Sequence, residues 1–313
     1  MKKPYLSIVI PVYNEEGNLE TLYQRLITIL DNIGKTYEII FTNDGSRDRS
    51  SAILHDLFLR RPKQIRVIEF NGNFGQHMAI MSAFERVRGE VIVTLDADLQ
   101  NPPEEIPKLL SAIENGHDYA GGYRKNRQDS LFRRLASKLN NFIRSRITGI
   151  YMTDQGCMLR AYQRRIIELM VASGETSTFI PALAYSYASN PTEVEVSHDA
   201  RAAGESKYSF YKLLRLNFDL MTGFSLIPLQ VFTLIGMLVS FFSSLLVIYL
   251  LLRRIILGPE ADGLFTLFAI LYFLVGIGLM GLGIMGEYIG RIYREVRRRP
   301  RFVIHHIEEQ LDE

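Results

Sequence analysis

Acidic side chains with the spacing of a metal or nucleotide site occur in the first third of the chain. Asp96 and Asp98 are two residues apart and follow the apolar run 90–95, and Asp44 follows the apolar run 37–42. Residues two apart in an extended chain point the same way, and carboxylate oxygens are the ligands that Mg²⁺ and Mn²⁺ prefer. The spacing predicts a divalent cation at Asp96 and Asp98, where it would carry a diphosphate.

Several other kinds of site are excluded by motif and composition. No Gly-x-Gly-x-x-Gly follows the first apolar run and no Gly-Lys-Ser/Thr loop occurs, so neither a dinucleotide site nor a P-loop is indicated. Cys157 is the one cysteine, which excludes an internal disulfide or a zinc site of several thiolates and favours a reducing compartment. A net charge of +2 gives no global field for nucleic acid, so no nucleic-acid partner is expected.

Strands and helices are expected to alternate in the segment that carries these carboxylates. Apolar runs predict strands at 6–12, 37–42, 65–70, 90–95 and 119–123, and helical periodicity predicts helices at 19–33, 50–60 and 76–87. Asn101 is expected to cap a further helix that begins at Pro102. This order is typical of an α/β fold with a doubly wound, mostly parallel sheet, whose ligands bind beyond the carboxyl ends of the strands.

The C-terminal third contains two long apolar segments, 221–252 and 263–286, that carry no charged residue. Each is longer than the roughly 20 residues needed to cross a bilayer, so we expect a two-helix transmembrane hairpin over 226–252 and 263–286; the alternative is a pair of buried core helices. Residues 209–225 have the pattern of an amphipathic helix, which suits a membrane surface or the core of a soluble domain.

Basic residues flank the two apolar segments and predict the topology. Lysines and arginines precede the first segment and six arginines follow the second, between Arg291 and Arg301. By the positive-inside rule, the domain 1–208, the tail 287–313 and both termini should be cytoplasmic. Arg253 and Arg254 in the short connection oppose this orientation, but Glu260 and Asp262 lie beside them.

Three motifs together resemble a known family. They are Ser7-Ile-Val-Ile-Pro-Val-Tyr-Asn-Glu-Glu16, Asn43-Asp-Gly-Ser46 and Leu95-Asp-Ala-Asp-Leu-Gln-Asn-Pro-Pro-Glu104. The chain resembles, over essentially its whole length, family 2 glycosyltransferases of the polyprenyl-phosphate branch. The segments 73–77, 126–130, 156–162, 177–181 and 204–209 most resemble the members that transfer 4-deoxy-4-formamido-L-arabinose for modification of lipid A. Members that transfer glucose to bactoprenol or mannose to dolichyl phosphate remain alternatives.

The resemblance implies a fold, a reaction and a location. It implies the glycosyltransferase A fold, a UDP-sugar donor, a Mg²⁺ or Mn²⁺ cofactor, inversion at the anomeric carbon and undecaprenyl phosphate as acceptor. The protein would be a multi-pass protein of the bacterial inner membrane, in contact with membrane lipid, and a homo-oligomer is also expected from the family.

The same resemblance assigns residues to the donor. Pro11, Tyr13, Glu15, Asp44 and Asp96 are expected to bind the nucleotide sugar. Asp44 is also suited to an Asx turn before Gly45. Asp96 and Asp98 are expected to bind the metal.

One further metal ligand is expected beside them, and the catalytic residues are expected to be Asp96, Asp98, Arg124 and Asp154. Gln100 is a third possible oxygen ligand of the metal, although a contact that caps the next helix would suit it equally. Asp154, in a turn before Gly156, is expected to touch the donor sugar or to orient the acceptor.

Cations are expected to gather the two anionic substrates. The second pKa of a phosphate monoester is near 6, so the acceptor oxygen is already nucleophilic at neutral pH and a general base is less necessary. The residues proposed for the acceptor phosphate are Arg124, Arg127, Arg133, Arg201, Ser206 and Lys207, and Arg134 and Arg160 lie in the same part of the chain. For Arg127, Arg133 and Arg134, solvated surface charges or ion pairs are an equal alternative.

Two other functions were weighed. A processive polysaccharide synthase would carry a Gln-x-x-Arg-Trp motif, which a chain without tryptophan cannot contain. A catalytically silent membrane scaffold that binds a nucleotide is the alternative from another class, and the complete set of carboxylates argues against it.

Overall fold

The computed structural model describes residues 3–124, 150–154, 156–175, 179–197, 222, 225–257, 264–297 and 300–310. The chain divides into two compact units. The first contains residues 1–139, 150–207 and 299–313, and the second contains residues 140–149 and 208–298. The carboxylates discussed above all belong to the first unit.

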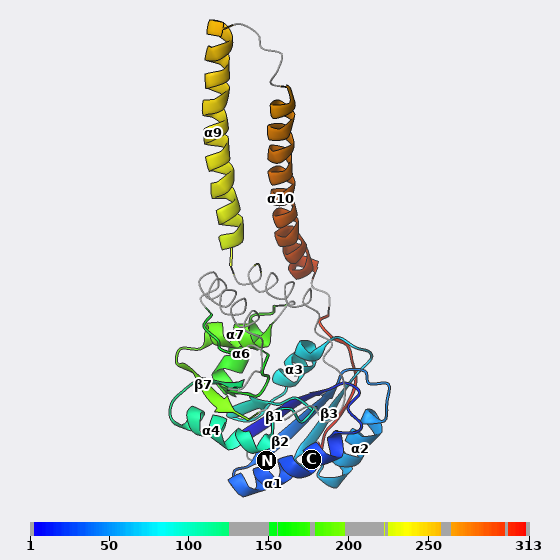
Figure 1. The fold of residues 1–313 in the computed structure, drawn as a ribbon. Helices are drawn as coiled ribbons and strands as arrows, with labels where there is room; N and C mark the ends of the chain where they lie inside the picture. Colours follow the sequence, from blue (N-terminus) through cyan, green and yellow to red (C-terminus); the bar gives the residue numbers. More distant parts are fainter. Residues whose placement is uncertain are drawn as a thin grey trace. The chain divides into compact units, whose positions relative to one another are not determined.

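The described part of the first unit is built on an eight-stranded sheet (Figure 1). Its strands are β1 (Leu6–Val12), β2 (Tyr37–Asn43), β3 (Ile65–Phe70), β4 (Val91–Thr94), β5 (Tyr119–Arg124), β6 (Arg160–Gln163), β7 (Pro191–Val196) and β8 (Ile304–Glu308). Their order is β7-β5-β6-β4-β1-β2-β3-β8. Strands β1 to β4 pair in parallel, and β6 and β8 run antiparallel to their neighbours.

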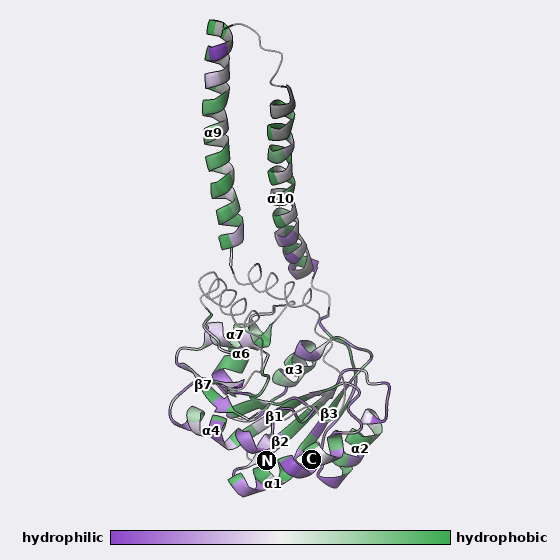
Figure 2. Ribbon diagram, viewed as in Figure 1, coloured by the Kyte–Doolittle hydropathy of each residue, from purple (hydrophilic) through white to green (hydrophobic). Residues whose placement is uncertain are grey.

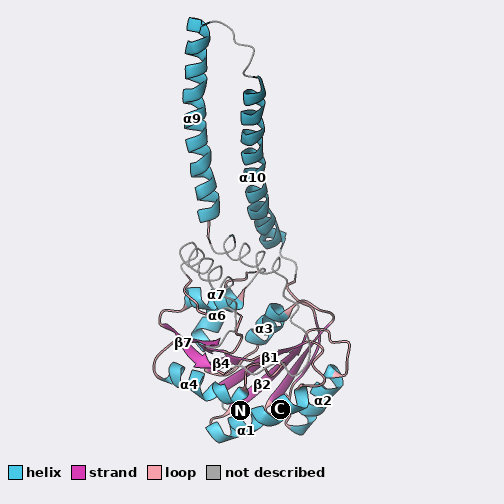
Figure 3. Ribbon diagram, in the orientation of Figure 1, coloured by secondary structure: helices cyan, strands magenta, loops and turns pink. Residues whose placement is uncertain are grey.

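Helices cover both faces of this sheet (Figures 1 and 3). One face carries α1 (Leu19–Ile33), α2 (Ser50–Arg60) and α4 (Ile106–Glu114), and the other carries α3 (Gln76–Phe84), α6 (Arg164–Ala172) and α7 (Ile180–Tyr187). Side chains of β1 to β3 are buried because helices lie above and below them, which explains their continuous apolar runs. The expected doubly wound, mostly parallel sheet is confirmed.

One local prediction was wrong. Asn101 does not cap a helix: Pro102 takes that position, before a short 3-10 helix η1 (Pro103–Glu105) that leads into α4. Near the C-terminus, residues 304–308 form β8, an antiparallel edge strand on β3 that the sequence did not predict.

The described part of the second unit contains two long helices, α9 (Ile227–Leu257) and α10 (Leu264–Arg297). Both are hydrophobic over most of their length (Figure 2). They contact each other: the Tyr288 hydroxyl donates to the Ser225 carbonyl at 2.7 Å, and Gly281 lies against the Phe232 ring, where a larger residue would overlap it. By length and composition, one segment of the described chain, Ile270–Arg297, could cross a membrane, and Ile227–Val239 is a shorter apolar helix.

Candidate active site

Asp96 lies just beyond the carboxyl end of β4 and is held by two amide side chains. Gln76 Nε2 donates to its Oδ1 at 2.6 Å, and Asn101 Nδ2 lies 3.4 Å from its Oδ2. Burial raises the pKa of Asp96 to about 7, and the charges of Asp98 and Glu15 add to this, whereas Arg124 and the Gln76 bond oppose it. Burial and the neighbouring carboxylates make the ionised form of Asp96 costly, and a cation bound beside it would favour that form.

Asp98 and Gln100 follow in the same tight turn. Leu99 has a φ of 61°, and the Gln100 N–H donates to Asp98 Oδ1 at 3.1 Å. The part of the chain that the structure describes contains no group of three His, Cys, Asp or Glu side chains able to hold a metal. Two carboxylates and an amide oxygen still fit Mg²⁺ or Mn²⁺, because Mg²⁺ is usually bound by one or two carboxylates together with substrate phosphates and water.

Arg124 and Asp154, both predicted as catalytic, are brought together by the fold. Arg124, the last residue of β5, donates from Nε and Nη2 to the two oxygens of Asp154 at 2.5 and 2.9 Å. Asp154 Oδ1 also accepts the Gly156 N–H at 3.1 Å. The hydrogen bonds from Arg124 to Asp154 raise the pKa of Arg124 further, so its charge is fixed. A planar guanidinium held by two bonds has one defined direction.

Arg160 is a correction to the predicted cluster of substrate-binding cations. It is only 1% exposed, so it does not offer its charge to a ligand at the surface. Its guanidinium donates to the carbonyls of Cys157 and Asp154 at 2.7 and 2.8 Å and to the Tyr119 hydroxyl. Arg160 therefore fixes the turn that carries Asp154.

Asp44 holds a loop at the carboxyl edge of the sheet. Its two carboxylate oxygens accept the Phe74 and Gly75 N–H groups at 2.6 and 2.8 Å. Burial raises the pKa of Asp44, and these two bonds oppose the rise. Gly45 has a φ of 67° and lies so close to Gly72 that a Cβ would be 2.5 Å from the Gly72 carbonyl carbon. The loop after β2 and the loop after β3 are thus packed backbone to backbone.

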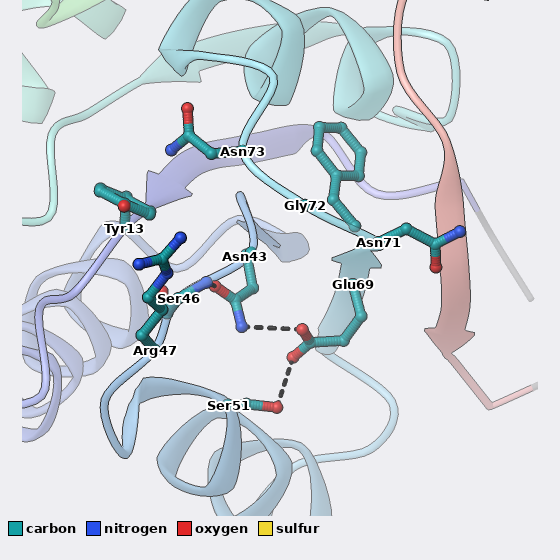
Figure 4. Close-up of a pocket in the computed structure, with 11 residues that line it drawn as sticks. Tyr13, Asn43, Ser46, Arg47, Ser51, Glu69, Asn71, Gly72 and Asn73 are labelled. Carbon is teal, nitrogen blue, oxygen red and sulfur yellow. Dashed lines mark hydrogen bonds between the residues drawn. The ribbon is translucent and has the colours of Figure 1, made fainter.

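A cavity of about 360 Å³ opens between these loops (Figure 4). Its lining residues come from the ends of β2 and β3, from the loops that follow β1, β2 and β3, and from the start of α2: Tyr13, Asn43, Gly45, Ser46, Arg47, Ser51, Glu69, Phe70, Asn71, Gly72 and Asn73. The figure shows Glu69 accepting hydrogen bonds from Asn43 and Ser51, at 2.7 and 3.0 Å. Tyr13 is 44% exposed at this cavity, so its ring is available to a planar ligand.

The remaining donor residues lie at the same edge or outside the described residues. Pro11 pairs with Thr42 near the end of β1, and the Glu15 carboxylate accepts from Asn18 Nδ2 at 2.7 Å. Arg127, Arg133, Arg134, Arg201, Ser206 and Lys207 lie outside the described residues, as does most of the amphipathic segment 209–225.

Two residues that contact Asp96, Gln76 and Asn101, were not predicted as site residues. Gln76 begins α3 and Asn101 is buried beyond β4, and both donate to Asp96. The available signal was position: each follows a strand of the parallel sheet, where ligand-binding residues gather.

Comparisons with known proteins show which sequences this chain is similar to. Residues 7–170 match the model of a family described as "Glycosyl transferase family 2". The chain is 48% identical over 304 residues to undecaprenyl-phosphate 4-deoxy-4-formamido-L-arabinose transferase of Aeromonas hydrophila, covering 96% of this chain and 93% of that one. It is 49% identical over 301 residues to the protein of the same name from Pectobacterium carotovorum, covering 96% and 92%.

Solved structures give weaker similarities. Glucosyl-3-phosphoglycerate synthase from Mycobacterium tuberculosis is 15% identical, with a TM-score of 0.47, and the match covers 70% of this chain and 78% of that one. S. aureus TarS in complex with UDP-GlcNAc is 18% identical, also with a TM-score of 0.47, and the match covers 71% and 67%.

Proposed function

The chain belongs to glycosyl transferase family 2, and on that basis we propose that it transfers a sugar from a UDP-sugar to undecaprenyl phosphate. The sugar is 4-deoxy-4-formamido-L-arabinose, and its transfer serves lipid A modification. The observation that carries this proposal is identity of 48–49% with transferases of that name over nearly the full length of both chains. A transferase is an enzyme, so the silent scaffold is no longer needed as an explanation.

The donor is placed at the carboxyl edge of β1, β2 and β4. We assign its nucleoside part to Pro11, Tyr13, Glu15 and Asp44, with Asp96 at the start of the diphosphate. Support comes from the exposed Tyr13 ring and from the loop that Asp44 holds in place. Asp44 already accepts two backbone N–H groups, so a contact with the base would use its remaining lone pairs.

We assign the metal to Asp96 and Asp98, with Gln100 as a third oxygen ligand. When bound, Mg²⁺ or Mn²⁺ would neutralise charge that develops on the leaving UDP. Support comes from the burial of Asp96 next to the charge of Asp98, because a bound cation would offset both costs of ionising Asp96. Gln76 and Asn101 would keep the Asp96 carboxylate in one orientation by donating hydrogen bonds to it.

The side chains of this site act on two anionic substrates. The acceptor phosphate is largely dianionic at neutral pH, so an oxygen of this phosphate attacks the anomeric carbon without needing a general base. We assign Arg124 to bind the acceptor phosphate near the donor. Asp154 fixes the direction of the Arg124 guanidinium. Attack on the face opposite the leaving UDP inverts the anomeric configuration. Arg127, Arg133, Arg201, Ser206 and Lys207 remain predictions for the acceptor phosphate.

Metal affinity should depend on pH because a proton on Asp96 competes with the cation. With the pKa of Asp96 at about 7, its carboxylate is mostly protonated at pH 6 and mostly ionised at pH 8. Mn²⁺ should therefore bind about tenfold more tightly at pH 8 than at pH 6. Calorimetric titration of the purified protein with Mn²⁺ at the two pH values measures this ratio, and equal affinity would contradict the assignment of Asp96 as a ligand.

We propose that α9 and α10 cross the inner membrane as a hairpin with both termini in the cytoplasm. Large apolar side chains along both helices are exposed, among them Met237, Phe242, Leu279 and Leu282, each at least 59%. Cys157 is fully buried, so a cysteine introduced at residue 310 would be the accessible thiol. An impermeant thiol reagent added to intact cells should leave residue 310 unlabelled and should label a cysteine introduced at residue 260; the reverse pattern would exclude this topology.

The reaction itself is tested by its lipid product. Purified enzyme is incubated with undecaprenyl phosphate, Mg²⁺ and UDP-4-deoxy-4-formamido-L-arabinose, and the lipid fraction is examined by mass spectrometry. The expected product is undecaprenyl phosphate with one formamido-pentose residue added, together with an equal amount of UDP. Release of UDP without a glycosylated lipid would show that the acceptor is wrong.

A further inference from the structure

The C-terminal segment packs against two residues that line the cavity of Figure 4. Strand β8 pairs with β3, and the register of this pairing shifts between Glu69 and Phe70. Beyond this irregularity the Asn71 N–H donates to the Val303 carbonyl at 3.0 Å. Phe70 and Asn71 both line the cavity. Residues 302–304 are therefore packed directly behind two of its lining residues.

An aromatic chain leads from this segment to Asp44. The Phe302 ring is stacked on the Phe70 ring, with centroids 5.2 Å apart and planes at 8°. Phe70 in turn meets the Phe74 ring edge to face at 5.6 Å. The backbone N–H of Phe74 donates to Asp44 at 2.6 Å. Each ring thus restricts the next, and the last ring belongs to Phe74, whose backbone N–H donates to Asp44.

The other end of β8 is held by charge. Glu309 forms ion pairs with Arg66 at 2.8 Å and with Arg88 at 3.0 Å, and the Arg66 side chain is only 7% exposed. Glu308 lies 3.0 Å from His55 Nδ1. Moving Glu309 away would leave the Arg66 charge buried without this partner, which is costly, so β8 is held at both of its ends.

We infer that Phe302 is a positioning residue for the donor pocket, by which we mean the cavity of Figure 4 together with Asp44. Phe302 acts through Phe70 and Phe74 to hold the 71–75 loop on Asp44. The identity of the occupant, the nucleoside part of a UDP-sugar, rests on the proposed function. The packing itself does not, because it is a property of the protein without ligand. In sequence, only residues 298 and 299 separate α10 from the described segment that contains Phe302.

The inference is tested on the full-length enzyme with three variants. Phe302→Ala removes the stacked ring, Phe302→Tyr retains it, and Val303→Ala shortens a neighbouring exposed side chain whose backbone makes the bond to Asn71. Phe302→Ala should raise the KM for the UDP-sugar and the Kd of UDP with Mg²⁺ about three- to tenfold, the factor that corresponds to losing an aromatic pair. The kcat should stay within about twofold of wild type, and the other two variants should behave as wild type.

A second measurement is independent of the donor. In hydrogen exchange of the unliganded protein, the Phe74 and Gly75 amides should exchange several-fold faster in Phe302→Ala and at the wild-type rate in the other two variants. Unchanged exchange in a folded Phe302→Ala protein would overturn the inference, as would a loss of kcat with an unchanged KM. If Phe302→Ala does not fold, Phe302→Leu replaces it with the same expectations. Faster exchange in an enzyme that never binds UDP would support the positioning role and would contradict the proposed function instead.

Discussion

Replacing Asp98 with asparagine is expected to lower sugar transfer by a hundredfold or more while the protein stays folded. The amide keeps the size of the side chain and can still accept the Gln100 N–H, so the turn should be preserved. It removes the negative charge that a hard divalent cation requires, and a lost electrostatic contact at the leaving group costs on the order of 10²- to 10³-fold. The measurement is kcat with saturating donor and acceptor, together with the melting temperature.

A matched control and a chelator complete this experiment. Asp56 is exposed on α2 and does not line the cavity, so Asp56→Asn should retain full activity. EDTA should abolish transfer by the wild-type enzyme, and added Mg²⁺ or Mn²⁺ should restore it. Transfer at a normal rate by folded Asp98→Asn, resistant to EDTA, would exclude a metal at this position.

The second large effect is expected at the Arg124–Asp154 pair. Arg124→Lys keeps the charge but loses the two-pronged geometry, and Asp154→Asn removes the charge that orients the guanidinium. Each variant should lose roughly ten- to a hundredfold in kcat/KM for undecaprenyl phosphate, as is typical when a partner that orients a functional group is removed. Arg165→Lys, an exposed arginine on α6, is the matched control and should be unaffected.

The double variant distinguishes one functional unit from two independent contacts. If Asp154 acts only by orienting Arg124, Arg124→Lys with Asp154→Asn should lose no more activity than the more impaired single variant. Since both side chains are largely buried, melting temperatures are needed to separate loss of fold from loss of function. Losses that multiply would show that Asp154 contacts substrate by itself.

The strands of the parallel sheet were predictable because burial on both faces leaves a clear mark in sequence. Leu6–Val12 and Ile65–Phe70 were predicted to the residue, and the strands that precede Asp44 and Asp96 were predicted to within one residue at each end. Strand β8 was missed for the opposite reason. Its sequence Ile-His-His-Ile-Glu does not alternate, it pairs on one side with β3 through an irregular register, and its partner lies more than 200 residues earlier.

Within the site, the sequence indicated which residue types are present but not the role of each residue. Arg124 and Arg160 were alike as cations that follow the metal strand, yet one is directed by a carboxylate and the other is buried against carbonyl groups. Asn101 was assigned to a helix cap because Pro102 follows it, whereas its amide is needed beside Asp96. Two of the contacts that decide these roles join residues 30 or more apart, Arg124 with Asp154 and Arg160 with Tyr119, and local patterns do not contain them.

This enzyme transfers 4-deoxy-4-formamido-L-arabinose, and a comparison of two sugar donors tests this most directly. A site that hydrogen-bonds a particular substituent loses a few kcal/mol when that group is missing, because buried polar partners are left unpaired. With undecaprenyl phosphate as acceptor, kcat/KM should be at least about a hundredfold higher for UDP-4-deoxy-4-formamido-L-arabinose than for UDP-glucose. A greater kcat/KM for UDP-glucose would contradict the sugar assignment.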